Sequence, residues 1–146
     1  SSVRRVAGGQ VTTVAGGDLF AFGDRDGAGD AVRLQHPVGI AAGEPGRLLL
    51  ADTLNHKVKT VDPASGAVAT LLGDGTPFDA AIARLEHRPE LPPDLRAAAG
   101  LREPEAVAWR DGEVLVVDTG NHRVLAVDPA TGAARRFGDR HSGYAQ

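Results

Sequence analysis

The stretch Leu48-Leu-Leu-Ala-Asp-Thr-Leu-Asn-His-Lys-Val-Lys-Thr-Val-Asp-Pro-Ala-Ser-Gly-Ala67 returns later in the chain as Val114-Leu-Val-Val-Asp-Thr-Gly-Asn-His-Arg-Val-Leu-Ala-Val-Asp-Pro-Ala-Thr-Gly-Ala133, and this repetition decides the fold. The two copies align without a gap, and Asp52 corresponds to Asp118, so the period is 66 residues. Self-similarity at a fixed period is the sequence signature of a repeat architecture. We therefore interpret the chain as a series of similar structural units.

Each copy predicts strands joined by tight turns. It contains an apolar run, a polar turn, a run in which apolar and polar residues alternate, and an Asp-Pro-Ala-Ser/Thr-Gly turn, which is the pattern of a β-meander. Proline presets φ at the second position of such a turn, and glycine supplies the left-handed residue that returns the chain to its strand. The residues expected to build these hairpins are Asp62, Pro63 and Gly66 in the first copy and Asp128, Pro129 and Gly132 in the second.

Two further strand candidates flank each copy. Residues 37–42 and 104–109 precede the copies, and residues 68–72 and 134–137 follow the Asp-Pro turns. Four antiparallel strands per repeat is the arrangement of a β-propeller blade. The sequence thus predicts an all-β fold, a β-propeller segment with complete four-stranded blades at residues 37–73 and 104–138.

The rest of the chain is assigned around these two blades. Residues 1–16 resemble the last two strands of a blade, residues 17–36 are an interblade connector, residues 74–103 an interblade insertion, and residues 139–146 a tail. Two and a half blades do not close a ring of four to eight blades, and they leave strand edges unpaired. We expect either that the chain was cut from a longer one or that copies of it complete a ring.

These features resemble the NHL repeat, whose signature of Pro-x-Gly, an apolar run, Asp-x-x-Asn-His, a cation and an Asp-containing turn occurs here in order. Residues 37–73 match it best, and residues 104–138 match it with Ala106 in place of the Pro-x-Gly glycine. The segment Asp18–Gly27, continued through Leu34–Gly39, is similar to proteins that join a thioredoxin-like domain to an NHL propeller. The resemblance implies a six-bladed parent with a redox-type domain outside this sequence.

The insertion between the two blades departs from the repeat. Asp79 can cap a short helix ended by Pro89, and the segment from Pro93 to Gly100 is typical of a second helical turn with a glycine stop. This insertion explains why the period exceeds that of an ordinary four-stranded blade. We interpret it as surface decoration, with a lid or a partner contact as the alternative.

Strand direction predicts where a ligand would bind. In an antiparallel blade, the turn between the second and third strands and the connection to the next blade emerge at the same end. The Asp-Thr-x-Asn-His turns, the connector Gly23–Leu34 and the insertion should therefore share one face of the ring. We expect any ligand on this face or in the central channel, and the candidate binding residues there are His56, His122, Asp24 and Asp26.

The polar residues of the repeated turn allow two interpretations. Asp52, Asn55, Asp118 and Asn121 could be oxygen ligands, but Asx side chains also hold such turns by bonding to nearby backbone N–H groups, and we favour that role. A ring of histidines equivalent to His56 and His122 could hold zinc, as in propeller lyases that resemble this fold. Because this histidine occurs in both blades, we favour a structural role.

The connector superficially matches a calcium loop. Asp24 and Asp26 have the right spacing, but Ala28 replaces an oxygen ligand and Gln35 stands where the loop requires a bidentate glutamate. We therefore predict a flexible connector, and no metal site or cofactor.

Composition narrows the function. The net charge is -3, aromatic residues make up 4% and cysteine is absent, so a polyanion-binding surface and thiol chemistry are disfavoured. No membrane-spanning run and none of the standard nucleophile, metalloprotease or phosphate-loop motifs occurs. We expect a non-enzymatic, cytoplasmic platform that binds a protein or peptide and no nucleic acid or membrane. The alternatives are a metal-dependent propeller enzyme of the lyase or lactonase type and, third, RNA binding.

Overall fold

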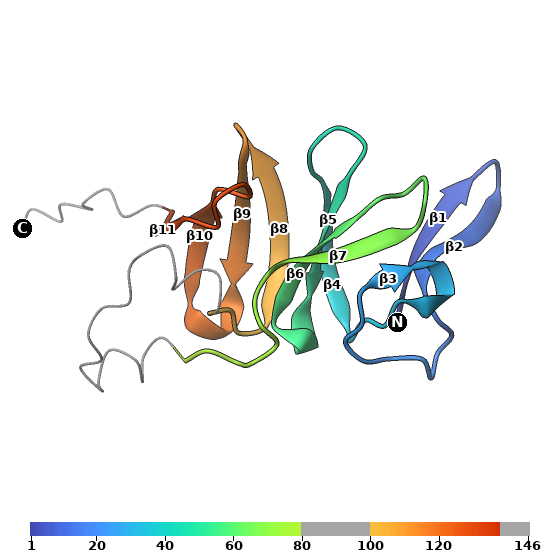
Figure 1. Ribbon diagram of the computed structural model, residues 1–146, viewed down its shortest axis with the longest axis horizontal. Helices are drawn as coiled ribbons and strands as arrows, with labels where there is room; N and C mark the ends of the chain where they lie inside the picture. The colour runs from blue at the N-terminus through green and yellow to red at the C-terminus, as the bar shows by residue number, and fades with distance from the viewer. Residues whose placement is uncertain (80–99, 138–146) are drawn as a thin grey trace, which may run out of the picture.

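The computed structural model describes residues 1–79 and 100–137 of the chain. Within them, strands form three separate sheets that stand side by side (Figure 1). Three single-turn 3-10 helices occur between strands, and the sequence did not indicate them. Most of the predicted helical insertion and the tail from residue 138 onward lie outside the described residues.

The first sheet is a two-stranded hairpin, as expected for the last half of a blade. Val3 and Ala15 point to its buried side and are 6% and 0% exposed, whereas Val6 and Val11 on the other side are 74% and 56% exposed. The hairpin thus has one covered and one open apolar face. Its strands are β1 (Ser2–Ala7) and β2 (Gln10–Gly16).

The first complete blade is an antiparallel meander in chain order. Its last hairpin is closed by Asp62, whose Oδ1 accepts hydrogen bonds from the backbone N–H groups of Ala64 and Ser65 at 2.8 and 3.2 Å, and by Gly66 at φ +74°. The elements are β4 (Pro37–Ala42), β5 (Leu48–Asp52), the 3-10 turn η2 (Thr53–Asn55), β6 (Lys57–Val61) and β7 (Ala67–Leu72).

The second complete blade repeats this meander. The N–H of Ala130 donates to Asp128 Oδ1 at 2.8 Å, and Gly132 has φ +74°, so the two Asp-Pro hairpins have the same geometry. The elements are β8 (Pro104–Arg110), β9 (Glu113–Asp118), the 3-10 turn η3 (Thr119–Asn121), β10 (Arg123–Val127) and β11 (Ala134–Arg136).

The sequence predicts that the connector before the first blade is a flexible loop at one end of the ring, but in the structure part of it forms a strand. Its strand β3 (Gly27–Ala28) pairs with the outer edge of β7 and makes the sheet five-stranded. The 3-10 turn η1 (Gly29–Ala31) follows, and the N–H of Gly29 donates to the carbonyl of Gly66 at 3.1 Å. The connector therefore runs along the blade edge to its other end, because the edge of β7 offers unpaired backbone groups.

Two apolar clusters hold the three sheets together. One lies between the two complete blades and includes Leu49 and Val58 from the first and Val114 and Val116 from the second. The other lies between the hairpin, the connector and the opposite face of the first blade. The first complete blade is thus covered on both faces, by the hairpin and connector on one side and by the second blade on the other.

The glycine of the Pro-x-Gly signature has a packing role. A Cβ on Gly39 would lie 2.4 Å from the carbonyl oxygen of Glu105, because β4 and β8 approach closely at the junction. Ala106, at the same place in the second blade, is exposed. Glycine is therefore required where the opening strand of a following blade lies against it.

Candidate functional site

The repeated Asp-Thr-x-Asn-His turn is organised around a buried carboxylate. Asp52 is 0% exposed, and it accepts hydrogen bonds from the backbone N–H of Gln35 and from Asn55 Nδ2, both at 2.8 Å. Asp118 is equally buried and accepts from the N–H of Arg102 at 2.7 Å and from Asn121 Nδ2 at 2.9 Å. Each aspartate therefore ties the turn to the segment that enters its own blade.

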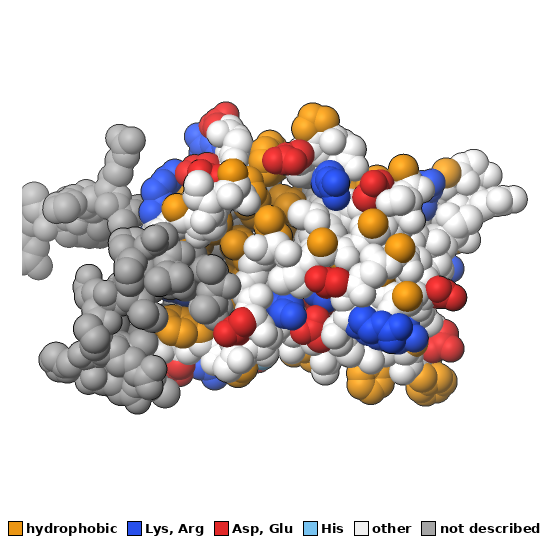
Figure 2. Space-filling model, in the orientation of Figure 1, with side chains coloured by type: hydrophobic (Ala, Val, Ile, Leu, Met, Phe, Trp, Pro, Cys, Tyr) orange, Lys and Arg blue, Asp and Glu red, His pale blue; other side chains and the backbone are white. Residues whose placement is uncertain are grey.

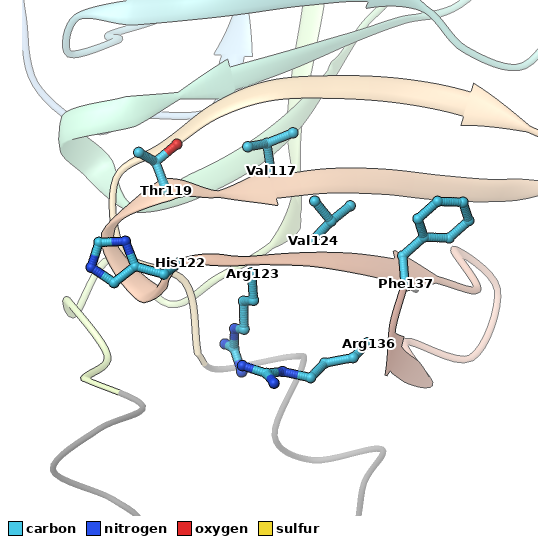
Figure 3. A pocket seen from close by; sticks show the side chains of 7 residues that line it. All are labelled: Val117, Thr119, His122, Arg123, Val124, Arg136 and Phe137. Carbon is cyan, nitrogen blue, oxygen red and sulfur yellow. The ribbon is translucent and has the colours of Figure 1, made fainter. Parts of the chain in front are cut away.

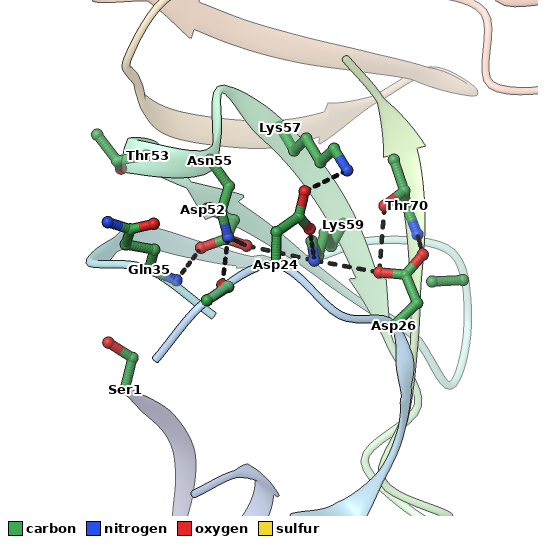
Figure 4. Close-up of polar contacts among 12 residues, drawn as sticks. Ser1, Asp24, Asp26, Gln35, Asp52, Thr53, Asn55, Lys57, Lys59 and Thr70 are labelled. Carbon is green, nitrogen blue, oxygen red and sulfur yellow. Dashed lines mark hydrogen bonds and ion pairs between the residues drawn. The ribbon is translucent and has the colours of Figure 1, made fainter. Parts of the chain in front are cut away.

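A lysine buried inside the first blade is the strongest electrostatic feature of the described residues. Lys59 is 0% exposed, and its Nζ lies 2.9 Å from Asp24, 3.1 Å from Asp26 and 3.4 Å from Asp52 (Figure 4). Asp24 also binds Lys57 Nζ at 2.5 Å. We call these five residues the ammonium clamp, because a charge on β6 holds the connector and the turn against the blade.

The ionisation of the clamp follows from this geometry. Burial lowers the pKa of Lys59, but the surrounding carboxylates outweigh it and the pKa lies above its ordinary value. Burial raises the pKa of Asp24 and Asp26, yet bonds from the two lysines and from Thr70 bring both below the ordinary value. For Asp52, burial dominates and its pKa is raised. The lysine is therefore held charged at neutral pH.

The clamp changes the interpretation of the connector. Asp26 also accepts from the N–H and the hydroxyl of Thr70, at 2.7 and 3.1 Å. The carboxylates expected at the binding face thus bind groups of their own blade, because a buried ammonium requires counter-charges. Lys59 was not among the predicted site residues. Its alignment with Leu125 in the second copy could have marked it as an inward position.

At the junction between the two blades, η2 binds the opening strand of the second blade. His56 Nδ1 accepts the N–H of Glu103 at 3.0 Å, and Thr53 Oγ1 donates to the carbonyl of Pro104 at 2.8 Å. His56 has φ +55°, so it ends the turn in a left-handed conformation. Here His56 is a structural acceptor. Thr53, which was not predicted as a site residue, could have been found from its recurrence as Thr119.

Among residues 1–79 and 100–137, no strand of a following blade lies against Thr119 and His122, the equivalent residues of the second blade. Thr119 Oγ1 is buried without a hydrogen bond among the described residues, and His122, at φ +52°, is exposed. Both lie in a groove of about 450 Å³ on the open face of the second blade (Figure 3). The groove is lined by Val117, Thr119, His122, Arg123, Val124, Arg136 and Phe137.

A second exposed feature lies in the connector. Leu19 and Phe20 are each 83% exposed and Phe22 is 63% exposed. Asp18 Oδ1 accepts the N–H groups of Phe20 and Ala21, both at 3.0 Å, so the segment is an Asx turn that projects apolar side chains. We call it the 18–22 loop. It leads into Gly23, whose carbonyl accepts from Asn55 Nδ2 at 2.7 Å and so places the end of the loop beside η2.

The described residues contain no group of three or more His, Asp or Glu side chains arranged to hold a metal ion. His56 is bonded within the junction and His122 lines the groove, so the two histidines serve different environments. Asp24, Asp26 and Asp52 converge, but around an ammonium group.

No helix in residues 1–79 and 100–137 is long and apolar enough to span a membrane.

Comparisons with known proteins agree with this architecture. No family model matches the chain. NHL repeat-containing protein 2 is 35% identical to the chain in both Gallus gallus and Homo sapiens, over 90% of the chain. Protein SUPPRESSOR OF QUENCHING 1, chloroplastic, of Arabidopsis thaliana, is 35% identical over 79% of the chain. The chain spans 18% of the length of the first two relatives and 10% of the third.

Solved structures from Bacteroides thetaiotaomicron share the fold. A protein of unknown function superposes with a TM-score of 0.62 at 15% identity, covering 85% of this chain and 29% of its own. An auxiliary nutrient binding protein gives 0.56 at 20% identity, covering 78% and 27%. A third, described as a candidate phosphatase, gives 0.55 at 24% identity, covering 76% and 25%. With its repeat, its blades and these relatives, the chain belongs to the NHL-repeat family of β-propellers.

Proposed function

We propose that the chain is a non-enzymatic module that binds a protein or peptide, with the 18–22 loop as its main contact. The observation that carries this proposal is the exposure of three large apolar side chains, Leu19, Phe20 and Phe22, on one ordered turn. Clustered exposed apolar groups mark interaction sites more than scattered ones do. Figure 2 shows apolar side chains projecting at the lower right, where Figure 1 draws the connector after β2.

The chemistry of the loop favours a protein partner. Aromatic side chains are enriched among the residues that dominate binding energy at protein interfaces. Because Asp18 already fixes the turn, little conformational entropy is lost when the loop is buried. The polar groups of the neighbouring turn, Asp52 and Asn55, are bonded to one another. Binding at this end is therefore expected to rest on apolar contact more than on ionic recognition.

The alternatives lack a comparable observation. A propeller enzyme of the lyase or lactonase type requires histidine and acidic ligands that converge on a metal, and the carboxylates that converge here surround Lys59. RNA binding requires a cationic face, whereas the chain carries a net charge of -3. Presentation of the bound protein to a thioredoxin-like domain, and a cytoplasmic location, remain predictions from the sequence.

Site-specific cross-linking tests the proposal. A photoreactive amino acid at position 20 should capture a specific protein that the same group at position 112, in the exposed β8–β9 turn, does not capture. With that protein purified, the Leu19→Ser/Phe20→Ser double variant should bind at least tenfold more weakly. The matched control is Val38→Ser, which changes a single exposed apolar residue on β4. Equal affinity of the double variant and the control would refute the role of the loop.

A further inference from the structure

We propose that a groove between the two complete blades binds an arginine side chain of a partner polypeptide. The guanidinium would stack on Trp109, pair with Glu44 and donate to the Pro129 carbonyl. This interblade groove has a volume of about 340 Å³ and is lined by residues of both complete blades. It lies at the end of the blades opposite η2 and the 18–22 loop, so this proposal and the proposed function can fail independently.

The interblade groove is formed by loops and strand ends of both blades. The loop from β4 to β5, residues 43–47, stands beside the end of β8 and the start of β9 (Figure 1). Leu49 and Val114 form an apolar floor and are 2% and 0% exposed. The other lining residues are more exposed, and they are Glu44, Arg47, Thr60, Leu71, Trp109, Pro129 and Ala130. An apolar floor with charged groups at its rim suits a long side chain with an apolar stem and a charged head.

The preceding junction, between the β1–β2 hairpin and the first blade, contains an arginine of the chain itself. The guanidinium of Arg5 on β1 donates to the carbonyl of Pro63, in the Asp-Pro turn of the first blade. Because β1 pairs with β2 in the same register as β6 with β7, with the bulge at the same place, Arg5 corresponds to Thr60. Pro63 corresponds to Pro129 in the repeated turn. At the junction between the two complete blades, a threonine therefore replaces the arginine.

The short side chain of Thr60 leaves the Pro129 carbonyl without this donor. Its hydroxyl donates instead to the carbonyl of Ala69 on the neighbouring strand, at 3.4 Å. Among the described residues, no group donates to the Pro129 carbonyl. The two Asp-Pro turns have the same geometry. A guanidinium from another polypeptide would therefore meet the acceptor that Arg5 meets in the preceding junction.

Trp109 gives the interblade groove an aromatic wall. It is the only tryptophan of the chain, and it packs partly buried against the core between the blades. The equivalent residue of the first blade is Ala42. The ring does not fill the space left by Thr60, since a volume of about 340 Å³ remains. Tryptophan is the side chain on which a guanidinium stacks most favourably.

The charges at the rim favour a cation. Glu44 is exposed, lines the groove and makes no ion pair among the described residues. Arg47 lines the groove too, but its charge also acts on Asp62 of its own blade. Hydrogen bonds within the turn of Asp62, and then the charge of Arg47, hold the pKa of that carboxyl below its ordinary value. Glu44 thus offers the carboxylate that a cationic ligand would complement.

Arginine fits these features better than lysine does. The stem of an arginine can pack on the apolar floor, its plane can stack on Trp109, and N–H groups at its edge can reach both the Pro129 carbonyl and Glu44. A lysine ammonium is a compact point charge without the planar group. The groove should therefore distinguish the two cations, which an acidic surface patch would not do.

The test uses the full 146-residue chain, isotope-labelled for NMR, and follows the indole N–H of Trp109. N-acetyl-arginine methylamide is the probe, and the citrulline compound, similar in shape but uncharged, is its matched control. We expect saturable shifts in the millimolar range with the arginine compound and about tenfold weaker binding of the citrulline compound. Glu44→Gln should weaken binding about threefold, and Glu105→Gln, exposed outside the groove, should not. Equal affinity for the two compounds would overturn the proposal.

Arg47→Gln separates a cationic from an anionic ligand. Removing this like charge should strengthen binding of the arginine compound about twofold. If the groove instead takes a carboxylate, N-acetyl-glutamate methylamide would shift the indole signal in the wild type and lose its effect in Arg47→Gln. That result would also overturn the proposal.

A second measurement does not depend on the affinity of a small compound. Thr60→Arg places an arginine in the groove from the chain itself, as Arg5 is placed in the preceding junction. It should raise the urea midpoint, shift the Trp109 indole signal and abolish the response to the arginine compound. Thr60→Lys should raise the midpoint less, and Thr76→Arg, at an exposed position outside the groove, should leave the indole signal unchanged. Equal midpoints and an unchanged indole signal in Thr60→Arg and Thr60→Lys would show that the groove does not recognise a guanidinium.

Discussion

The two complete blades have the same turn and the same meander, but one equivalent buried position carries a charged side chain in the first blade and an apolar side chain in the second. Position 59 in the first blade is a fully buried lysine, and the equivalent Leu125 in the second is 4% exposed. The connector before the first blade brings Asp24 and Asp26 to the lysine. Before the second blade, the N–H of Phe78 donates to the carbonyl of Leu101 as that of Gly23 donates to Leu34, and the next residue, Asp79, binds Arg102 at 2.8 Å. The connector thus determines whether a blade position tolerates a charge.

A second contrast concerns the outward faces of the same blades. The first blade has a successor that satisfies Thr53 and His56. The second ends in a groove where Thr119 has no partner among the described residues. The same threonine and histidine in equivalent turns therefore differ in their hydrogen bonds according to the strand that lies against them.

The largest expected effect comes from placing the lysine in the wrong blade. Leu125→Lys should lower the free energy of unfolding by more than about 3 kcal/mol, because the described part of the second blade offers a buried lysine only Asp118, which already binds Arg123 at 2.7 Å, in place of the three carboxylates around Lys59. Leu125→Met is the volume-matched control and should cost less than about 1.5 kcal/mol. Urea denaturation followed by the fluorescence of Trp109 measures both. Similar midpoints for the two variants would show that position 125 is accessible to water.

The converse change removes the ammonium from the first blade. Lys59→Met should destabilise the chain by about 3 kcal/mol, since Asp52 stays buried without its ammonium partner, while Asp24 keeps only Lys57 and Asp26 keeps only Thr70. Adding Asp24→Asn and Asp26→Asn should recover part of this loss by removing two of the three charges. The same urea titration applies, and failure of the added changes to recover stability would contradict the clamp.

The repeated threonines sharpen the second contrast because their substitutions should differ in sign. Thr53→Val should destabilise by about 1 kcal/mol, because it breaks a buried hydrogen bond and strands the Pro104 carbonyl. Thr119→Val removes a hydroxyl without a partner and should be neutral or stabilising. Each variant controls for the other in volume and in turn position. Equal losses at both positions would mean that Thr119 is satisfied in solution.

The smallest expected effect is on pH dependence. The pKa values of Asp24 and Asp26 lie below the ordinary 3.8, so their stabilising contribution is present above pH 3.8 and is lost as the pH falls through the lower folded pKa. The raised pKa of Asp52 acts in the opposite direction. As the pH falls from 5.5 to 2.5, the unfolding free energy should therefore decrease less in Asp26→Asn than in the wild type. If the unfolding free energies of the variant and the wild type changed in parallel with pH, Asp26 would not contribute to the clamp.

The repeat made the blades and turns predictable from the sequence. Asp62, Pro63 and Gly66 build the hairpin expected of them, because turn geometry depends on residues that are adjacent in the chain. The strands followed from apolar patterning at a fixed period. The sequence also indicated that Asp52 and Asp118 belong to turns, although it did not indicate that each also binds the segment entering its blade.

Only the tertiary structure decided which of these equivalent residues are satisfied. A lysine in an alternating strand looks solvent-exposed until a connector folds back along the blade edge and encloses it with carboxylates. Thr53 and Thr119 occupy the same position of the repeated Asp-Thr-x-Asn-His turn, and they differ because β8 lies against one turn and no described strand of another blade lies against the other. Local propensity therefore determines the form of each blade, and long-range contacts determine which groups remain available for binding.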